Sequence, residues 1–260
     1  MPTSLWHIRQ TSPYWTSASG LAQLAWEQKI LNTFSENVFG YYAVTLELNA
    51  LHLLEHSSIP HILRMDSASQ EKICRSLSPN QKNPVNILVD LHHWPFDDDS
   101  LDYIVLPHVL EFSDNPHSIL REAHRCLRAG GYLSITAFNP HSFLGLQAGH
   151  IKLGHRHQWL TRRCLLDWMQ LLNLYPDRGA FGQWRPMTQH FKLFNRLAWL
   201  DKAGERWWPQ GANIFALRVV KRVVTDTRQV VIRQHSLLDH LLQPAAITAA
   251  NTDKPITINN

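Results

Sequence analysis

Between residues 43 and 138 the sequence alternates short strand-like runs with stretches that have helical spacing. Residues with strand preference cluster in five runs, which cover 43–48, 60–65, 85–89, 101–106 and 132–138. Strands that alternate with helices favour a parallel sheet covered by helices on both faces. We therefore predict an α/β fold with a Rossmann-like, doubly wound and mostly parallel sheet.

The helix expected after the fourth strand has the clearest boundary signals. Pro116 suits the first helical position with Asn115 as its cap, and Gly130-Gly131 is expected to end the helix. Further helices are predicted over 20–34, 51–56, 67–77, 161–174 and 191–200. Two more strands, predicted over 180–184 and 213–220, bring the expected sheet to seven strands.

The first of these helices, 20–34, is expected to bury a mixed apolar stripe formed by Leu21, Leu24, Ala25, Gln28 and Leu31. We divide the chain into an N-terminal helical lead-in (1–40), a main α/β domain (41–225) and a C-terminal tail (226–260). The tail is polar and has few large apolar side chains, which predicts a largely disordered segment. We expect deletion of 245–260 to leave the thermal midpoint nearly unchanged.

Composition narrows the class of protein. The 44% hydrophobic and 18% charged residues are typical of a globular domain, and the formal net charge is +4. Basic residues are scattered through the C-terminal half, which favours a solvated surface over a nucleic-acid patch. No apolar run approaches the ~20 residues of a membrane span, and the N-terminus lacks signal-peptide features. With three widely spaced cysteines and no CxxC, the sequence predicts a reduced, cytoplasmic protein.

One stretch of sequence has specific spacing. Asp90 is followed after four residues by Pro95-Phe96, then by an acidic turn and Leu101-Asp102. The sequence PHVLEF follows over 107–112, and LREAHRCLRAGGYL over 120–133. This pattern resembles the type 11 family of class I S-adenosylmethionine-dependent methyltransferases. The resemblance covers roughly residues 40 to 222.

The resemblance implies a cofactor site at the ends of the strands. In the family the acid that ends the second strand binds the ribose hydroxyls, and Asp66 matches it. The acid that ends the third strand meets the adenine amine, which corresponds to Asp90, and Leu91 would donate its backbone N–H to the ring. His108, after the fourth strand, would lie under the methionine moiety. From the residues alone, Asp66 could equally be a turn or cap residue, and His108 a packed histidine.

The first strand departs from the family pattern. Glu47 keeps the expected acid, but every glycine of the family's glycine-rich loop is missing from the sequence LELNALH over 46–52. Asn49 stands where a glycine is expected, and asparagine tolerates left-handed backbone angles better than most residues. The loop therefore predicts either a looser cofactor pocket or a pocket closed by side chains.

Two further groups of residues were considered as sites. His150, His155 and His157 lack matching cysteine or acid partners, so we expect no metal site. A set of aromatic side chains between the sixth and seventh strands could form a substrate lid or a buried core. These are Phe194, Trp199, Trp207 and Trp208.

The leading hypothesis is an S-adenosylmethionine-dependent methyltransferase with an unidentified small-molecule or macromolecular acceptor. Methyl transfer depends mostly on the alignment of the reacting groups, so the sequence assigns no catalytic residue. The alternative is a catalytically inactive methyltransferase-like protein that serves as a binding module. The missing glycines favour the alternative, whereas Glu47, Asp66 and Asp90 favour the enzyme. The oligomeric state stays open.

Overall fold

The structure, a computed structural model, describes residues 14–46, 53–54, 57–67, 86–147, 158–188 and 190–222. Its helices are α2 (Ala18–Ser35), α3 (Pro116–Cys126), α4 (Phe143–Leu146), α5 (Arg162–Leu171), α6 (Phe191–Arg196) and α7 (Trp199–Trp207), with 3₁₀ turns η1 (Leu110–Phe112) and η3 (Pro209–Gly211). Its strands are β1 (Tyr42–Leu46), β2 (His61–Ser67), β3 (Asn86–Val89), β4 (Leu101–Pro107), β5 (Leu127–Phe138), β6 (Leu174–Gly182) and β7 (Ile214–Lys221).

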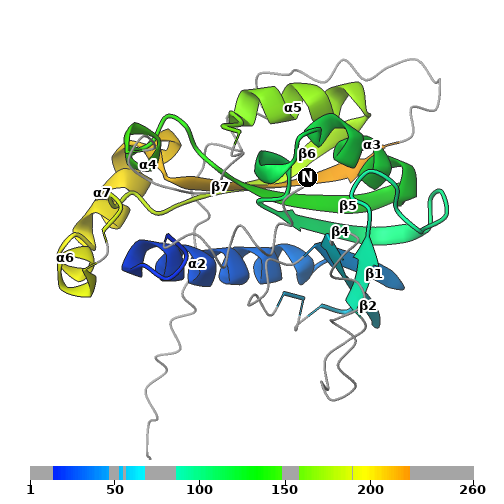
Figure 1. Ribbon diagram of the computed structural model, residues 1–260, viewed down its shortest axis with the longest axis horizontal. Helices are drawn as coiled ribbons and strands as arrows, with labels where there is room; N and C mark the ends of the chain where they lie inside the picture. The colour runs from blue at the N-terminus through cyan, green and yellow to red at the C-terminus, as the bar shows by residue number, and fades with distance from the viewer. Residues whose placement is uncertain are drawn as a thin grey trace, which may run out of the picture.

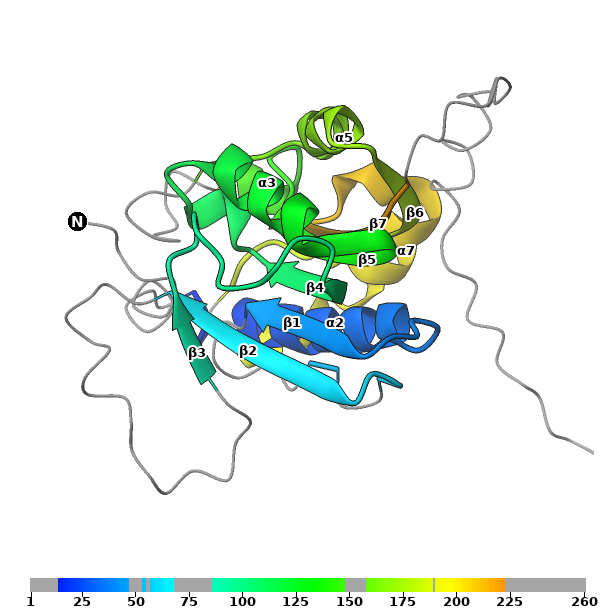
Figure 2. The same ribbon diagram turned by 90° about the vertical axis from the view of Figure 1, so that its right-hand side faces the viewer.

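The strands form one seven-stranded sheet in the order β3-β2-β1-β4-β5-β7-β6. Strands β1 to β5 run parallel, while β7 is antiparallel to both of its neighbours, β5 and β6. Helix α2 covers one face of the sheet, and α3 and α5 cover the other, as Figures 1 and 2 show. The predicted seven-stranded, mostly parallel sheet with helices on both faces is confirmed.

Strand β4 shows why this sheet needs helices on both faces. All seven of its residues are buried, which is the pattern of a strand in the middle of a parallel sheet. Ile104 and Leu106 belong to a core cluster that includes residues of α3 and α5. Tyr103 and Val105 point the other way and pack with Leu31 of α2 in a second cluster.

Helix α2 buries only part of the predicted stripe: Leu31 is fully buried and Leu24 packs against the core. Leu21 and Ala25 are exposed, whereas Gln23 and Glu27 are fully buried in line with Leu31. In the middle of the helix the buried positions 23, 27, 31 and 34 follow helical spacing of three to four residues, but polar side chains fill two of these four. The prediction was therefore wrong for Leu21 and Ala25. The buried face is centred on Gln23 and Glu27 instead, because these polar side chains have buried partners that an amphipathic pattern does not reveal.

The end of α3 also differs from the prediction. The helix stops at Cys126, and Leu127 already pairs with Leu101 as the first residue of β5. Gly130, with φ of 78°, lies in an irregular part of the strand where the register shifts. Lys221 of β7 donates to the carbonyl oxygens of His124 and Leu127, at 2.8 and 2.7 Å. A lysine side chain, not a glycine, therefore binds the carbonyls at this helix end.

Two other predicted boundaries were wrong. Strand β6 begins at Leu174, well before the predicted 180. Its pairing with β7 continues on both sides of a register shift between Pro176 and Arg178, so the proline does not end the strand. The single helix predicted over 191–200 is two helices, α6 and α7, separated by a turn at 197–198. Helices predicted over 51–56 and 67–77 fall mostly outside the described residues, as does the tail over 226–260; Ser67 itself ends β2.

A buried arginine joins α2 to the last two strands. Arg218 of β7 is 3% exposed, and it donates to the carbonyl of Phe34 near the end of α2. The same guanidinium pairs with Asp177 of β6 and lies over the Tyr132 ring, 4.7 Å from its centroid. The helix of the predicted lead-in thus packs and hydrogen-bonds within the same core as the sheet.

We predict that Gly20→Ala destabilises the protein by about 1–3 kcal/mol, the usual cost of a forced contact in a packed site. A Cβ at Gly20 would lie 2.2 Å from the backbone oxygen of Tyr14, which the buried Tyr14 and Trp15 side chains hold in place. Helix propensity alone predicts the opposite sign. Denaturant unfolding measures the effect, with Ala25→Ser on the exposed face of α2 as control. A gain in stability for Gly20→Ala would contradict the packing.

Candidate functional site

The carboxyl ends of β1, β2, β3 and β4 meet at one edge of the sheet because these strands are parallel neighbours. Strands β2 and β3 lie on one side of β1 in the sheet, and β4 and β5 lie on its other side, so the strand order reverses between β1 and β4. Ligands in open α/β sheets bind at such a switch point, outside the carboxyl ends of the strands. All six predicted cofactor residues follow or end one of these four strands in the sequence.

Three of these six residues have little structural description. Glu47 and Asn49 lie outside the described residues. Asp66 lies in β2 beside Leu88 of β3, near the end of the strand, and only its backbone is described. The roles of these residues as cofactor ligands stay predictions.

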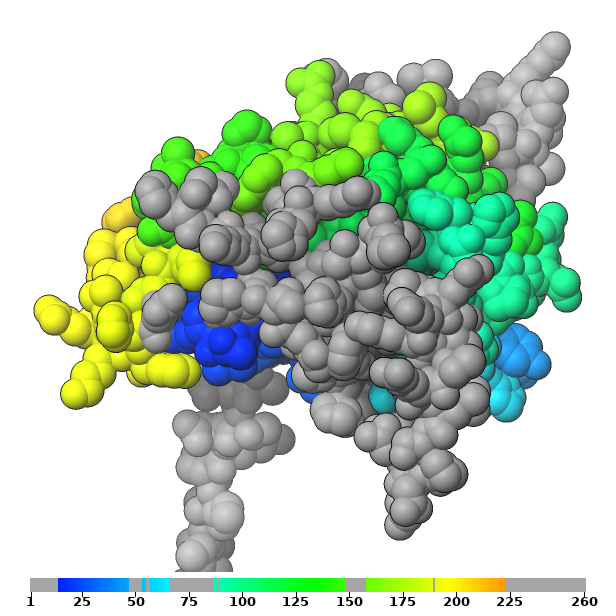
Figure 3. Space-filling view, in the orientation of Figure 1, coloured from blue at the N-terminus to red at the C-terminus, as the bar shows by residue number. Residues whose placement is uncertain are grey.

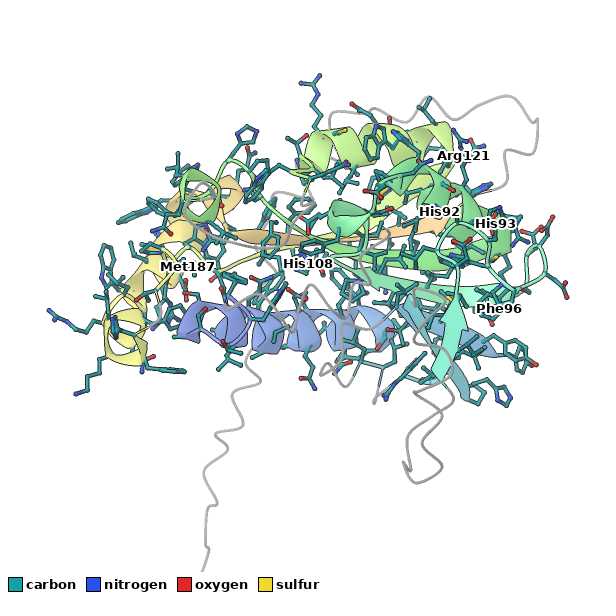
Figure 4. All side chains as sticks on the ribbon, viewed as in Figure 1. His92, His93, Phe96, His108, Arg121 and Met187 are labelled. Atoms are coloured by element: carbon teal, nitrogen blue, oxygen red, sulfur yellow. The ribbon has the colours of Figure 1, made fainter. Side chains whose placement is uncertain are left out.

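Asp90 follows β3 and begins a tight turn. Its Oδ1 accepts the backbone N–H of His92 at 2.9 Å, and its Oδ2 lies 3.2 Å from Nδ1 of His93. The hydrogen bond from His92 is the main cause that lowers the pKa of Asp90 below its usual value. The side chain is 60% exposed, so the turn presents an oriented, ionised carboxylate at the sheet edge. Figure 4 shows His92 and His93 in this turn.

Leu91, the next residue, is half-buried and packs against the main core cluster. Its carbonyl accepts a hydrogen bond from the Trp94 indole at 2.9 Å, which fixes the backbone of the turn. The roles of Asp90 and Leu91 toward the adenine ring stay predictions.

His108 follows β4 and is fully buried, with an unusual φ of 53°. Its Nδ1 lies 2.5 Å from Oε2 of Glu111, and its Nε2 lies 2.7 Å from Oε1 of Glu27. The ring packs against Phe138, with ring centroids 4.2 Å apart. Figure 4 places His108 between the sheet and α2. A buried non-glycine residue at positive φ is strained, and such residues concentrate at functional sites.

The polar cluster around His108 extends along α2. The side-chain amide of Gln23 donates to Glu27 Oε1 at 2.7 Å, and its Oε1 accepts from the Tyr14 hydroxyl. Glu111 Oε1 accepts the backbone N–H of Phe138 at 2.6 Å. The cluster thus connects the N-terminal segment, α2, the end of β4 and the end of β5.

The two carboxylates control the charge of His108. Burial by itself would lower the pKa of this imidazole, but Glu27 and Glu111 outweigh it and raise the pKa to about 10. A protonated imidazole donates from both nitrogens, one to each carboxylate. Both ring nitrogens are therefore engaged by this chain's own side chains, and a role for His108 under the methionine moiety stays a prediction.

Sequence reasoning missed Gln23 and Glu27. Glu27 is the more informative of the two, since none of the described residues donates a hydrogen bond to its buried Oε2. A buried carboxylate oxygen is costly without a donor. The sequence offered one signal, an acidic residue in a helix that precedes the sheet. That signal identifies Glu27 as a buried residue only when the position of His108 beside it is known.

The aromatic side chains between β6 and β7 divide into two groups. Phe194 is 5% exposed and packs under the guanidinium of Arg185. Trp199, Trp207 and Trp208 are 62%, 79% and 51% exposed. The core hypothesis therefore holds for Phe194 and is wrong for the three tryptophans.

No cluster of three or more potential metal ligands occurs among the residues with described positions. His150, His155 and His157 lie outside that set. None of the helices in the described part is long and apolar enough to cross a membrane.

Comparison with known proteins identifies the family of this chain. A family model described as "Methyltransferase domain" matches residues 47–135, which run from Glu47 through β5. The uncharacterized protein YafS of Escherichia coli is 36% identical over 181 residues, which cover 65% of this chain and 69% of that protein. The chain belongs to the type 11 family of class I methyltransferases.

Solved methyltransferases share the fold of this family member. A Haloferax volcanii methyltransferase, solved with the Trm112 methyltransferase activator, aligns with a TM-score of 0.56 and 16% identity over 81% of this chain and 94% of that chain. A SAM-dependent methyltransferase from Archaeoglobus fulgidus gives 0.53 and 13%, over 76% and 94%. Geranyl diphosphate C-methyltransferase from Streptomyces coelicolor gives 0.51 and 14%, over 78% and 81%. At these identities the likeness concerns the fold.

We predict that His108 makes the protein less stable as pH rises. Because its pKa is about 10 in the folded protein and about 6.5 when unfolded, its contribution is fully present below pH 6.5 and is lost as pH rises through 10. Denaturant unfolding across this range should show a steeper fall for the wild type than for His108→Gln. His141→Gln, at an exposed position, is the control and should follow the wild type. Equal slopes for the wild type and His108→Gln would refute a protonated His108.

Proposed function

We propose that this chain is an S-adenosylmethionine-dependent methyltransferase that acts on an acceptor still to be identified. The observation that carries the proposal is the oriented carboxylate of Asp90 at the carboxyl end of β3, in a methyltransferase domain. When bound, S-adenosylmethionine supplies a methyl group on a positively charged sulfur. The chain's own residues have to hold that cofactor, align the acceptor and keep water out.

The described side of the proposed cofactor site fits an adenosine group. The exposed carboxylate of Asp90 can accept hydrogen bonds from an amine, and Leu91 contributes a fixed backbone beside it. Asp66 lies on the adjacent strand, and a carboxylate there could accept both ribose hydroxyls. We assign Glu47 and Asn49 to the same site on the resemblance alone.

Glu27 has a positioning role in the proposal. His108 holds one of its oxygens at 2.7 Å, and Gln23 donates to the same oxygen, so the carboxylate has a fixed direction. Its Oε2 is the oxygen that lacks a donor among the described residues. The side chain is fully buried, so an acceptor does not reach this oxygen, and the proposal gives Glu27 the role of positioning His108 and α2.

The alternative function is a binding module that has lost catalysis. The observation in its favour is the absence of glycine from 46–52, where the family brings the backbone close to the cofactor. Both functions share the fold, so only cofactor binding distinguishes them.

Calorimetry with S-adenosylhomocysteine tests the proposal. We expect the wild type to bind and Asp90→Asn to bind more weakly by about 1.5–3 kcal/mol, the scale of hydrogen bonds to charged groups. Asp66→Ala should lose a similar amount, and Asn49→Gly should bind equally well or better because it restores backbone freedom. Asp97→Asn, which changes an exposed acid in the following turn, is the matched control.

The same titrations separate the two functions. If neither the wild type nor Asn49→Gly binds at millimolar ligand, the binding module replaces the enzyme. If the wild type binds and Asp90→Asn binds equally well, the enzyme stands and the adenine assignment is wrong.

A further inference from the structure

The connection between β6 and β7 emerges at the same edge of the sheet as the proposed site. Strand β6 is parallel to β5, because both are antiparallel to β7, so its end at Gly182 lies at the edge where β4 leads into His108. Helix α4 follows β5 at this edge as well. Figure 1 shows α4, α6 and α7 grouped at one end of the molecule.

Exposed apolar side chains concentrate on this group of helices. Seven of the twelve exposed large hydrophobic side chains in the described part of the chain belong to α4, α6, α7 or the residue after α7. They are Phe143, Leu146, Phe191, Leu193, Trp199, Trp207 and Trp208. We call this set the insert face. Part of it, the α6–α7 segment, projects from the molecule in Figure 3. Such concentrations on a surface mark sites of interaction.

Basic side chains lie among these apolar ones. On α7 the spacing places Lys202 and Arg206 on the same helical face as Trp199, and Trp207 borders that face. Helix α6 adds Lys192 and Arg196, and all four basic residues are exposed. The acids are fewer: Glu205 is exposed, whereas Asp201 is paired with Arg185 at 2.7 Å. The insert face is therefore both aromatic and positively charged.

The insert face is held in shape by polar contacts beneath it. Trp184 donates its backbone N–H to Asp201 at 3.0 Å and its indole N–H to the carbonyl of Trp208 at 2.9 Å. Arg185 bonds Asp201 and the Phe194 carbonyl, which joins α7 to α6. The Phe143 and Trp208 rings lie 6.1 Å apart, edge to face, so α4 and the α7 end form one surface. The exposed rings thus project from a fixed support.

We propose that the insert face docks on an anionic lipid surface. Surfaces of Trp, Phe and Leu edged by Lys and Arg bind at the membrane interface, where rings enter the headgroup region and cations meet lipid phosphates. Charge favours this occupant over a second copy of the chain, since a symmetric contact would bring the basic side chains of both copies into one interface. The inference needs neither the cofactor nor the proposed activity, but it places the sheet edge that carries His108 next to the lipid.

Vesicle sedimentation with the full chain tests the proposal. We expect binding to phosphatidylcholine vesicles that contain phosphatidylglycerol, weak binding to phosphatidylcholine alone, and loss of binding as salt is raised. Lys202→Gln and Arg206→Gln should each weaken binding about fivefold. The double variant Trp199→Ser/Trp207→Ser should weaken it at least as much, because both rings are lost from the interface.

Matched controls come from exposed residues elsewhere. Phe39 and Tyr41 are 74% and 67% exposed and precede β1, at the opposite edge of the sheet. Phe39→Ser/Tyr41→Ser and Lys29→Gln on α2 should bind vesicles like the wild type. Circular dichroism of each variant checks that it is folded.

Three results would overturn the proposal. The first is that the protein binds vesicles with and without phosphatidylglycerol equally well, or binds neither kind. The second is equal loss of binding in the control variants. The third is a dimer in sedimentation velocity that Trp199→Ser/Trp207→Ser dissociates, which would assign the insert face to a second copy. Calorimetry with S-adenosylhomocysteine is independent of all three, so a failure here leaves the proposed activity untouched.

Discussion

The pairing of His108 with two buried glutamates determines how the N-terminal helix meets the sheet. Moving a charged carboxyl from water into a protein interior costs several kcal/mol unless a partner of opposite charge is well placed. Glu27 has that partner only when α2 lies against the end of β4, at the rotation that also buries Gln23. Glu111 satisfies His108 from the other side and holds the end of β5 through Phe138. The cluster therefore fixes one position of α2 on a face that apolar contacts alone would specify less sharply.

The sheet could be predicted from the sequence because its signals are local. Each central strand is a short apolar run, and the spacing from Asp90 to Gly131 fixes β3, β4, α3 and β5 in order. The face of α2 could not be predicted in this way, since an acid counts as a surface residue unless its partner is known. The partner, His108, lies 81 residues away in the sequence. The same reason explains why Asp90 was found by its spacing whereas Glu27 was missed.

Boundary errors arose where tertiary contacts replaced local signals. Glycines usually end helices by providing left-handed backbone angles, and this led to the predicted helix end at Gly130-Gly131. Here Lys221 binds the carbonyls near the end of α3, and Gly130 adopts its left-handed backbone angle inside β5 instead. The exposure of Trp199 and Trp207 was equally out of reach of sequence patterns, because tryptophan serves in cores and interfaces alike. The orientation of α7, with Trp199 and Trp207 toward solvent, is fixed by the polar contacts of Trp184 and Arg185.

The position of Arg218 has a consequence for how the chain is made. A ribosome releases α2 well before β7, yet the Phe34 carbonyl and the Arg218 guanidinium must meet across 184 residues. Until β7 arrives, β5 has an open edge between Tyr132 and Phe138, and β6 has no neighbour in the sheet. Open strand edges pair readily with other chains, and long-range pairings form slowly. The nascent protein therefore passes through a stage, during synthesis, in which the edge of β5 and the whole of β6 are exposed to misassembly.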